Sequence, residues 1–365
     1  MSTVSVPANS ESGGMPSKGP LVSILINNFN YASFLKEAIQ SALDQTYRNI
    51  EVIVVDDGST DGSRSVIESF GRRIYPVFKP NGGQGSAYNV GFESSRGDLI
   101  HFLDSDDMLA PNAIEEAVRV WQPGVAKVQF YLKVIQGADG NPTEALVPAG
   151  TLPSGNLREE ILKAGNYISP PSSGNFYSRD ALLELLPMPP KDWITEADLY
   201  CIFQSPFFGE VRSIDQALGF YRVHEKNSSA KTTLTGQVLR NKLKDEARRD
   251  TLLSAFCSVR GISYAPGTVS RHIGHYKVRL ASLLVDPGNH PFPQDKPLSL
   301  LVEAIRLCWT DNSLSMKQKV FFSAWLAALA IGPKRYRSRL LQLGFAPVQR
   351  PRIFQRFLKP TTARS

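Results

Sequence analysis

Residues 21–30 read LVSILINNFN and residues 50–59 read IEVIVVDDGS, so that each apolar run is followed at once by polar residues. Residues 98–107, DLIHFLDSDD, repeat the pattern. Short β-branched apolar runs that end in turn residues are typical of buried strands. Between the first two runs, residues 34–43 carry apolar side chains at spacings of three and four, and residues 63–70 read as a second helix. This alternation predicts a parallel, doubly wound α/β sheet.

Two details of the predicted sheet concern its loops. Ser33 is expected to cap the helix that follows the first strand. After a third short strand at 75–78, residues 81–89 read NGGQGSAYN, a glycine-rich loop that leads into a helix. Glycines there let the backbone approach a ligand closely or adopt positive φ, and a simple turn is the alternative. The loop matches neither GxGxxG nor GxxxxGK[ST], so both common nucleotide fingerprints are absent.

Polar clusters end three of the predicted strands, at residues 27–30, 56–59 and 104–107. In doubly wound sheets, ligands bind beyond the carboxyl ends of the strands, so one edge could collect all three clusters. The alternative is that Asn, Asp, Gly and Ser terminate strands through local hydrogen bonds alone. Asp104 and Asp106 put two carboxylates into one sharp turn, and such hard oxygen ligands suit Mg²⁺ or Mn²⁺. A solvated turn is the competing interpretation of that motif.

The composition is that of a globular protein. The chain has 365 residues, 42% of them apolar and 10% aromatic, which excludes overall disorder and predicts about two domains. Its three cysteines are widely spaced, which argues against a disulfide framework or a cysteine-based zinc site and favours a reducing cytosol. Residues 1–20 are rich in Ser, Gly and Pro and lack the apolar run of a secretory signal, so we expect a disordered tail.

Acidic and basic residues are distributed unequally along the chain, with an acidic amino-terminal part and a basic carboxy-terminal part. Residues 236–365 hold 22 Lys and Arg against 7 Asp and Glu, whereas residues 1–235 hold 19 against 27. Apolar spacing in the basic part predicts helices near 238–259, 269–285, 297–309 and 315–331. Its longest apolar stretch, at 320–331, has 12 residues, too few for the roughly 20 that a spanning helix needs.

The basic region suits nucleic acid, an anionic membrane surface or a phosphorylated substrate. No helix-turn-helix, zinc finger or RNA-recognition motif accompanies the charge, so we expect no nucleic-acid partner. Arginines and apolar residues interleave over 320–365, a pattern that suits the headgroup region of an anionic membrane. A solvated basic tail on an ordinary helical bundle is the alternative.

Taken in order, the motifs of residues 22–63 and 81–111 resemble the nucleotide-sugar half of the family 2 glycosyltransferases, which have the GT-A fold. The resemblance is close over residues 21–122 and looser to about residue 230. Two later segments still fit: WITEADLY at 193–200 and LGFYRVHEKNSS at 218–229, which is similar to the family's closing Tyr-Arg-x-His stretch.

The resemblance implies roles for single residues. Asn27 and Phe29 occupy positions at which the family contacts the nucleotide base and ribose. The family more often has Pro or Thr at the position of Asn27 and Tyr at the position of Phe29. Asp57 occupies the position of a carboxylate that accepts a hydrogen bond from a pyrimidine N–H. Asp106 matches the metal-binding position of the family's DxD motif, and His224 matches a histidine near the metal or the diphosphate, which would favour Mn²⁺. The residues assigned to donor binding are Asn27, Phe29, Asn30, Asp57, Gly85, Asn89, Asp104 and Ser105.

The resemblance also implies a base and a division of the chain. Asp198 is the carboxylate expected to deprotonate the acceptor hydroxyl, with Glu196 as its competitor and a helix cap as its structural alternative. Residues 21–235 would form the GT-A domain, 21–122 its nucleotide-sugar half and 123–235 its acceptor half. Residues 236–365 would form a basic helical region.

The function implied is a metal-dependent inverting transfer from a nucleoside-diphosphate sugar, favouring UDP, to a hydroxyl of a saccharide or lipid-linked acceptor. Surface polysaccharide or glycolipid synthesis is the expected context, in the cytoplasm and peripheral to the inner face of the plasma membrane. One alternative is a nucleotidyltransferase, but NNFNYASF after the first strand lacks the glycines and base of that class. The other is a degenerate sugar-nucleotide-binding or scaffold protein, against which the joint presence of Asp57, Asp104, Asp106 and Asp198 argues.

Overall fold

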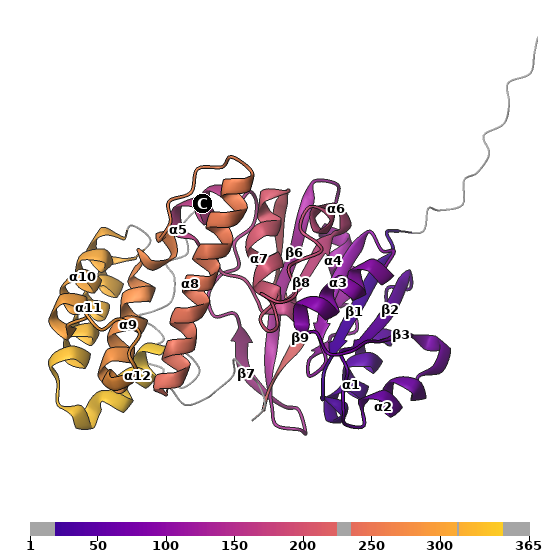
Figure 1. Ribbon diagram of the computed structural model, residues 1–365, viewed down its shortest axis with the longest axis horizontal. Coiled ribbons are helices and arrows are strands. Elements are labelled where there is room, and N and C mark those ends of the chain that lie inside the picture. The colour runs from indigo at the N-terminus through magenta and orange to yellow at the C-terminus, as the bar shows by residue number, and fades with distance from the viewer. Residues whose placement is uncertain (1–18, 225–234, 312–313, 346–365) are drawn as a thin grey trace, which may run out of the picture.

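The computed structural model describes residues 19–224, 235–311 and 314–345 (Figure 1). Within these residues, nine strands form one sheet and a group of helices follows it. The strands are β1 Val22–Asn28, β2 Ile50–Asp56, β3 Tyr75–Phe78, β4 Leu99–Asp104, β5 Met108–Leu109, β6 Val125–Gln136, β7 Asn141–Val147, β8 Asn175–Ser178 and β9 Glu210–Val223. The helices are α1 Ala32–Leu43, α2 Ser63–Ser69, α3 Gln84–Ser94, α4 Ala113–Val120, α5 Arg158–Ala164, α6 Arg179–Leu183, α7 Asp198–Gln204, α8 Gly236–Val259, α9 Ile273–Val285, α10 Pro297–Thr310, α11 Met316–Ile331 and α12 Arg337–Phe345.

The sheet is parallel in its first half and mixed in its second. Its order is β3-β2-β1-β4-β8-β6-β9-β5, and β7 pairs with β6. Strands β1 to β4 pair in parallel, whereas β8 runs antiparallel to both β4 and β6. The predicted α/β class and the helical region that follows it are confirmed. The antiparallel β8 lies in the stretch where the sequence pattern is least regular.

Helices cover both faces of the sheet, as the sequence predicts. Successive side chains of a strand point to opposite faces. Val22, Ile24 and Ile26 of β1 therefore pack with the apolar sides of α1, α2 and α4. Leu25 of β1 and Ile53 of β2 pack on the other face with α3, α6 and α7. Each fully buried aliphatic side chain contributes about 1.5–3 kcal/mol, so this layering accounts for much of the domain's stability.

The start of α1 differs from the expectation. The helix begins at Ala32, and no neighbouring side chain caps it, so Ser33 is not the cap. Instead the Asp61 carboxylate, from the loop after β2, accepts a hydrogen bond from the Ala32 N–H at 3.0 Å. Sequence rules for helix caps consider only residues next to the helix start, so they cannot predict a cap from Asp61, 29 positions away.

Only the last two residues of the expected amino-terminal tail lie within the described residues. Residues 1–18 lie outside the described residues. Pro20 accepts a hydrogen bond from the Tyr47 hydroxyl at 2.7 Å, and Gly19 accepts one from the Asn49 side chain at 2.6 Å. These two tail residues therefore pack on the domain.

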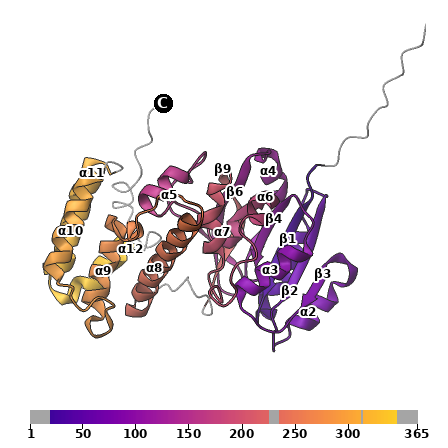
Figure 2. The ribbon, with the colours of Figure 1, turned by 45° about the horizontal axis from the view of Figure 1, so that its top comes forward.

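The helical region adjoins the sheet domain through α8, which lies beside α7, while α10 and α11 lie at the far end (Figures 1 and 2). Leu252 and Leu253 of α8 join the sheet domain's apolar clusters, whereas Leu239 of the same helix belongs to a separate cluster with the later helices. The apolar stretch predicted to be a buried or membrane-lying helix is α11. None of the helices in the described ranges has the length and hydropathy to cross a bilayer. All three cysteines are free and buried.

Candidate active site

The polar ends of β1, β2 and β4 meet at one edge of the sheet. In the parallel registers Asn27 pairs with Asp104 and Asn28 with Asp56, which brings the predicted polar clusters together. They border a cavity of about 440 Å³, which we call the donor cavity. Its wall includes Asn27, Asn28, Phe29, Tyr31, Asp57, Gly83, Gln84, Asp104, Ser105, Asp106, Glu196, Asp198 and Tyr221.

Two amide oxygens in this wall have no hydrogen-bond partner among the described residues. The Asn27 Nδ2 atom donates to Asp104 Oδ1 at 3.4 Å, and the Asn28 Nδ2 atom donates to Asp56 Oδ1 at 2.8 Å. The Oδ1 atom of each asparagine is buried and unpaired. A buried acceptor left unpaired costs about 1–3 kcal/mol, so both oxygens are suited to a ligand's N–H or O–H group or, for Asn27, a cation.

Asp57 organises the glycine-rich loop. Its carboxylate accepts backbone N–H groups from Gly82 at 2.9 Å and Gly83 at 2.7 Å, and it forms an ion pair with Lys79. This buried carboxylate therefore already has three protein donors. The predicted contact between Asp57 and a pyrimidine base stays a prediction. Lys79 was not singled out from the sequence, which offers no local signal for a partner 22 residues away.

The turn after β4 concentrates carboxylates. Asp106 Oδ2 lies 3.0 Å from His224 Nε2, and the assignment of these two residues to a metal site stays a prediction. Asp107 accepts hydrogen bonds from the Ser173 hydroxyl at 2.6 Å and the Arg222 N–H at 2.9 Å. Burial, and after it the charge of Asp106, raises the pKa of Asp104 and of Asp107 well above the ordinary range. Burial and mutual repulsion therefore oppose the ionisation of these two carboxyl groups.

Arg222 holds this turn in place, and the sequence reasoning did not assign it a role. Its side chain is 1% exposed. Its Nε atom donates to the Asp106 carbonyl at 3.0 Å, and its Nη2 atom donates to Glu37 of α1 at 2.5 Å. Its Nη1 atom donates to the Ala138 carbonyl, in the turn between β6 and β7, at 3.0 Å. The Tyr-Arg-x-His segment was the available signal, because it contains this arginine.

The glycines of the loop make room for protein rather than ligand. A Cβ atom on Gly83, whose φ is +84°, would lie 2.6 Å from Ile194 Cα, and one on Gly85 would lie 2.8 Å from the Trp193 carbonyl oxygen. The Gly85 N–H donates to that carbonyl at 2.7 Å. Gln84 Oε1 accepts the Ala197 N–H at 3.0 Å. The start of α3 thus fixes the segment that carries Asp198.

Asp198 is the first residue of α7, and no side-chain cap bond forms at this helix start. Burial raises the pKa of its carboxyl to about 6, with a smaller contribution from the charge of Glu196. Glu196 has a φ of +59°, a left-handed conformation that is uncommon outside glycine. Its carboxylate lies 3.6 Å from Arg248. The assignment of Asp198 rather than Glu196 as the base stays a prediction.

Most of the sequence-predicted site residues line the donor cavity, among them Phe29, which is 44% exposed. Four of the predicted residues do not line it: Asn30, Gly85, Asn89 and His224. Asn30 has a φ of +60° and accepts the Thr60 N–H, a turn function. Asn89 exchanges hydrogen bonds with the backbone of Met188, and Gly85 packs on Trp193, so the structure gives both a supporting place behind the wall. His224 contacts the site through Asp106.

The donor set fits a divalent cation that a substrate helps to hold. In the described part of the chain, no three His, Cys, Asp or Glu side chains are grouped so as to hold a metal ion by themselves. Asp104 and Asp106 supply carboxylate oxygens, and the unpaired Asn27 Oδ1 atom lies on the same wall. One or two carboxylates, with water and phosphate oxygens completing the shell, is how Mg²⁺ is usually bound beside nucleotides.

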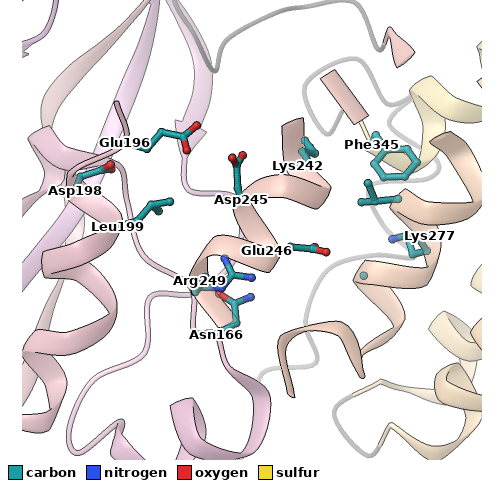
Figure 3. A pocket seen from close by; sticks show the side chains of 12 residues that line it. Asn166, Glu196, Asp198, Leu199, Lys242, Asp245, Glu246, Arg249, Lys277 and Phe345 are labelled. Carbon is teal, nitrogen blue, oxygen red and sulfur yellow. The ribbon is translucent and has the colours of Figure 1, made fainter. Parts of the chain in front are cut away.

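A second cavity, of about 430 Å³, lies on the other side of Glu196 and Asp198, between α7 and the helical region (Figure 3). We call it the interdomain cavity. Residues from α8, α9 and α12 form most of its wall. They include Lys242, Asp245, Glu246, Arg249, Lys277 and Phe345.

Residues 23–186 match the sequence model of Glycosyl transferase family 2. These residues are therefore similar to a glycosyl transferase family 2 domain. Over 213 residues it is 38% identical to an uncharacterized glycosyltransferase of Nostoc sp., an alignment covering 57% of this chain and 66% of that protein. An uncharacterized glycosyltransferase of Rickettsia typhi is 46% identical over 101 residues, 28% of this chain and 32% of that protein. The matched regions span less than two thirds of these relatives.

Solved structures show the fold around the matched residues. The chain resembles S. aureus TarS in complex with UDP, at a TM-score of 0.51 and 14% identity, covering 89% of this chain and 91% of that one. It also resembles the mannosyltransferase PcManGT from Pyrobaculum calidifontis in complex with GDP-Man and Mn²⁺, at a TM-score of 0.50 and 14% identity, covering 91% and 87%. These likenesses show a GT-A fold.

Proposed function

We propose that this protein is a metal-dependent, inverting glycosyltransferase that moves a sugar from a nucleoside-diphosphate sugar to an acceptor hydroxyl. One observation carries the proposal: the Asp104–Asp106 turn, Asn27 and Asn28 with their unpaired side-chain oxygens, and Asp198 line a single cavity. Donors related to UDP are favoured, because the solved TarS complex holds UDP. Synthesis of a surface polysaccharide or glycolipid is the proposed context.

In this proposal each residue has a definite task. Asp198 takes the proton from the acceptor hydroxyl as that oxygen attacks the anomeric carbon, in one displacement that needs no covalent enzyme intermediate. Asp104, Asp106 and His224 would hold Mn²⁺ or Mg²⁺, which supplies Lewis-acid stabilisation of the leaving diphosphate. Arg222 fixes the turn through the Asp106 carbonyl. Asn27, Asn28 and Phe29 form the wall for the nucleoside.

The parts of the chain divide the work in the same proposal. Residues 21–122 bind the donor, and residues 123–235 contribute Asp198 and the acceptor half. Residues 236–365 form the basic helical region. Its residues 346–365 lie outside the described part of the chain.

The first test is thermal unfolding of the purified protein with UDP, GDP, dTDP, CDP or ADP, each with and without Mn²⁺. A ligand at about 100 times its dissociation constant stabilises the folded state by about 2.7 kcal/mol, which raises the melting temperature measurably. We expect a Mn²⁺-dependent shift with one nucleotide, UDP first. No shift with any of the five would contradict the proposal and favour a degenerate or scaffold protein of the same fold.

We further propose that α11 rests on an anionic membrane surface, at the cytoplasmic face. Met316, Val320 and Ile331 follow each other at helical spacing on α11 and are 64%, 54% and 70% exposed. Lys317 and Arg335 lie beside this stripe, and each base near an anionic surface contributes about 1 kcal/mol.

This membrane proposal predicts binding to phosphatidylglycerol vesicles and little binding to phosphatidylcholine vesicles. In co-sedimentation, the double variant Val320→Glu with Ile331→Glu should lower partitioning about tenfold or more, because it puts charge into the apolar stripe. Val259→Glu, at an exposed position at the end of α8, is the matched control and should bind normally. Equal partitioning of all three proteins would disprove it.

A further inference from the structure

The interdomain cavity lies outside the part of the chain that the family match covers. Residues 23–186 carry that match, whereas eleven of the twelve side chains drawn in Figure 3 come from residues 196–345. The exception is Asn166. Glu196 and Asp198 line both this cavity and the donor cavity. A molecule in the interdomain cavity would therefore border the same two residues as a donor in the donor cavity.

The charges in this cavity are arranged along its length. Glu196 and Asp198 lie at one end, and Lys242, Lys277 and Phe345 lie at the other (Figure 3). The two ammonium groups lie 5.8 and 5.9 Å from the centre of the Phe345 ring. Lys277 also lies 4.4 Å from the ring centre of Phe322. Aromatic rings hold a cation in position without neutralising its charge.

The acids near the middle of the cavity are already engaged. Glu246 Oε2 lies 2.6 Å from His275 Nδ1. Asp245 shares a hydrogen bond with Glu196, and burial together with that neighbour raises the pKa of Asp245 to about 7. These carboxyl groups are therefore poor partners for a further cation.

On the cationic side, Lys242 makes no hydrogen bond or ion pair within the described residues. Burial of its ammonium lowers its pKa, and the charges of Glu246 and Asp245 act in the opposite direction. In the middle of the cavity, the Nε atom of Arg249 is buried and has no partner among the same residues (Figure 3). Donors of this kind are satisfied by a ligand that brings anionic oxygen atoms.

We infer that the interdomain cavity is the acceptor site and that it takes an acceptor with an anionic group, a phosphate or a carboxylate, held by Lys242 and Lys277 while its reacting hydroxyl lies at Asp198. This inference rests on the proposed function. It assigns the choice of acceptor to the helical region, which supplies the anion-binding end. The phosphate can belong to a sugar phosphate or to a lipid phosphate, and the carboxylate to a sugar acid.

The test measures binding of four probes by calorimetry, without divalent cation so that the donor cavity does not compete: glucose, glucose 1-phosphate, glucuronic acid and farnesyl phosphate. We expect at least one anionic probe to bind about tenfold or more tightly than glucose. The double variant Lys242→Gln with Lys277→Gln should lose that preference, since it removes both charges and leaves polar side chains only one atom shorter. The anionic probe that binds best identifies the source of the anionic group.

Lys244→Gln is the matched control, because Lys244 is an exposed lysine of the same helix outside the cavity wall. It should bind every probe as the unaltered protein does. UDP binding with Mn²⁺, measured on all three proteins, separates the two proposals. Normal UDP binding together with no anionic preference, or with a preference that survives the double variant, overturns the acceptor inference alone. If the unaltered protein does not bind UDP with Mn²⁺, the proposed function itself is overturned.

Discussion

Asp198→Asn is expected to lower the rate of sugar transfer about 10²- to 10⁴-fold, the usual contribution of a general base. The amide keeps the size of the side chain and cannot accept the acceptor's proton. Initial rates of nucleoside diphosphate release, measured with saturating donor, give the comparison. Glu196→Gln is the matched control, because Glu196 borders the same two cavities and should cost far less. A larger loss for Glu196→Gln than for Asp198→Asn would reverse the assignment.

The same substitution has an expected effect on stability. Burial raises the pKa of Asp198 to about 6, so the folded protein holds this proton more tightly than the unfolded chain does. The stability from this group is therefore fully present below its unfolded pKa and is lost as the pH rises through about 6. At pH 7, the free energy of unfolding of the Asp198→Asn variant should exceed that of the unaltered protein by up to about 3 kcal/mol. This difference should disappear near pH 4.

The pH profile of the unaltered protein follows from the same group. Because only the deprotonated carboxylate can act as the base, kcat/KM should fall as the pH drops through about 6. The Asp198→Asn variant should lack this limb. A profile that is flat between pH 5 and 7, or an Asn variant less stable than the parent at pH 7, would count against a buried, catalytic Asp198.

Asp106→Asn is the second substitution with a large expected effect. The amide keeps a polar atom for His224 but removes the negative charge offered to a cation. We expect transfer to fall by about 10³-fold, equivalent to about 4 kcal/mol, and the Mn²⁺-dependent thermal shift with nucleotide to disappear. The unliganded melting temperature should change little.

An exposed carboxylate near the same region serves as control. Asp139 lies in the turn between β6 and β7 and is exposed, so Asp139→Asn removes the same charge without touching the donor cavity. It should leave both transfer and the thermal shift unchanged. If Asp106→Asn retained a normal Mn²⁺-dependent shift, the cation would have to be held elsewhere.

Local pattern accounts for the parts of the fold that the sequence predicts well. Each apolar run of the first half is a strand, and the helices predicted at 238–259, 297–309 and 315–331 are α8, α10 and α11 to within two residues. The turn that holds Asp104 and Asp106 follows from the end of β4 in the same way. These features depend on neighbours within one or two turns of chain, and periodicity records such neighbours directly.

Tertiary packing decided how those pieces became a site. Arg222 reaches Glu37 across 185 positions, and Gly85 must be small because Trp193, more than a hundred positions away, lies against it. Asn89 looks like a donor-binding residue in the sequence but is used to hold Met188. No local pattern encodes such contacts, because they arise only when separate strands and helices are packed together.

The sequence by itself determined the first four strands, most of the later helices and the acidic turn that gives the donor cavity its chemistry. Only the tertiary structure decided that Asp198 stands between two cavities, and that α8 and α9 bring Lys242 and Lys277 to the second. The physical reason is range. Strand and helix patterns are set by hydrogen bonds and burial along the chain, whereas a cavity is set by which buried faces meet across it.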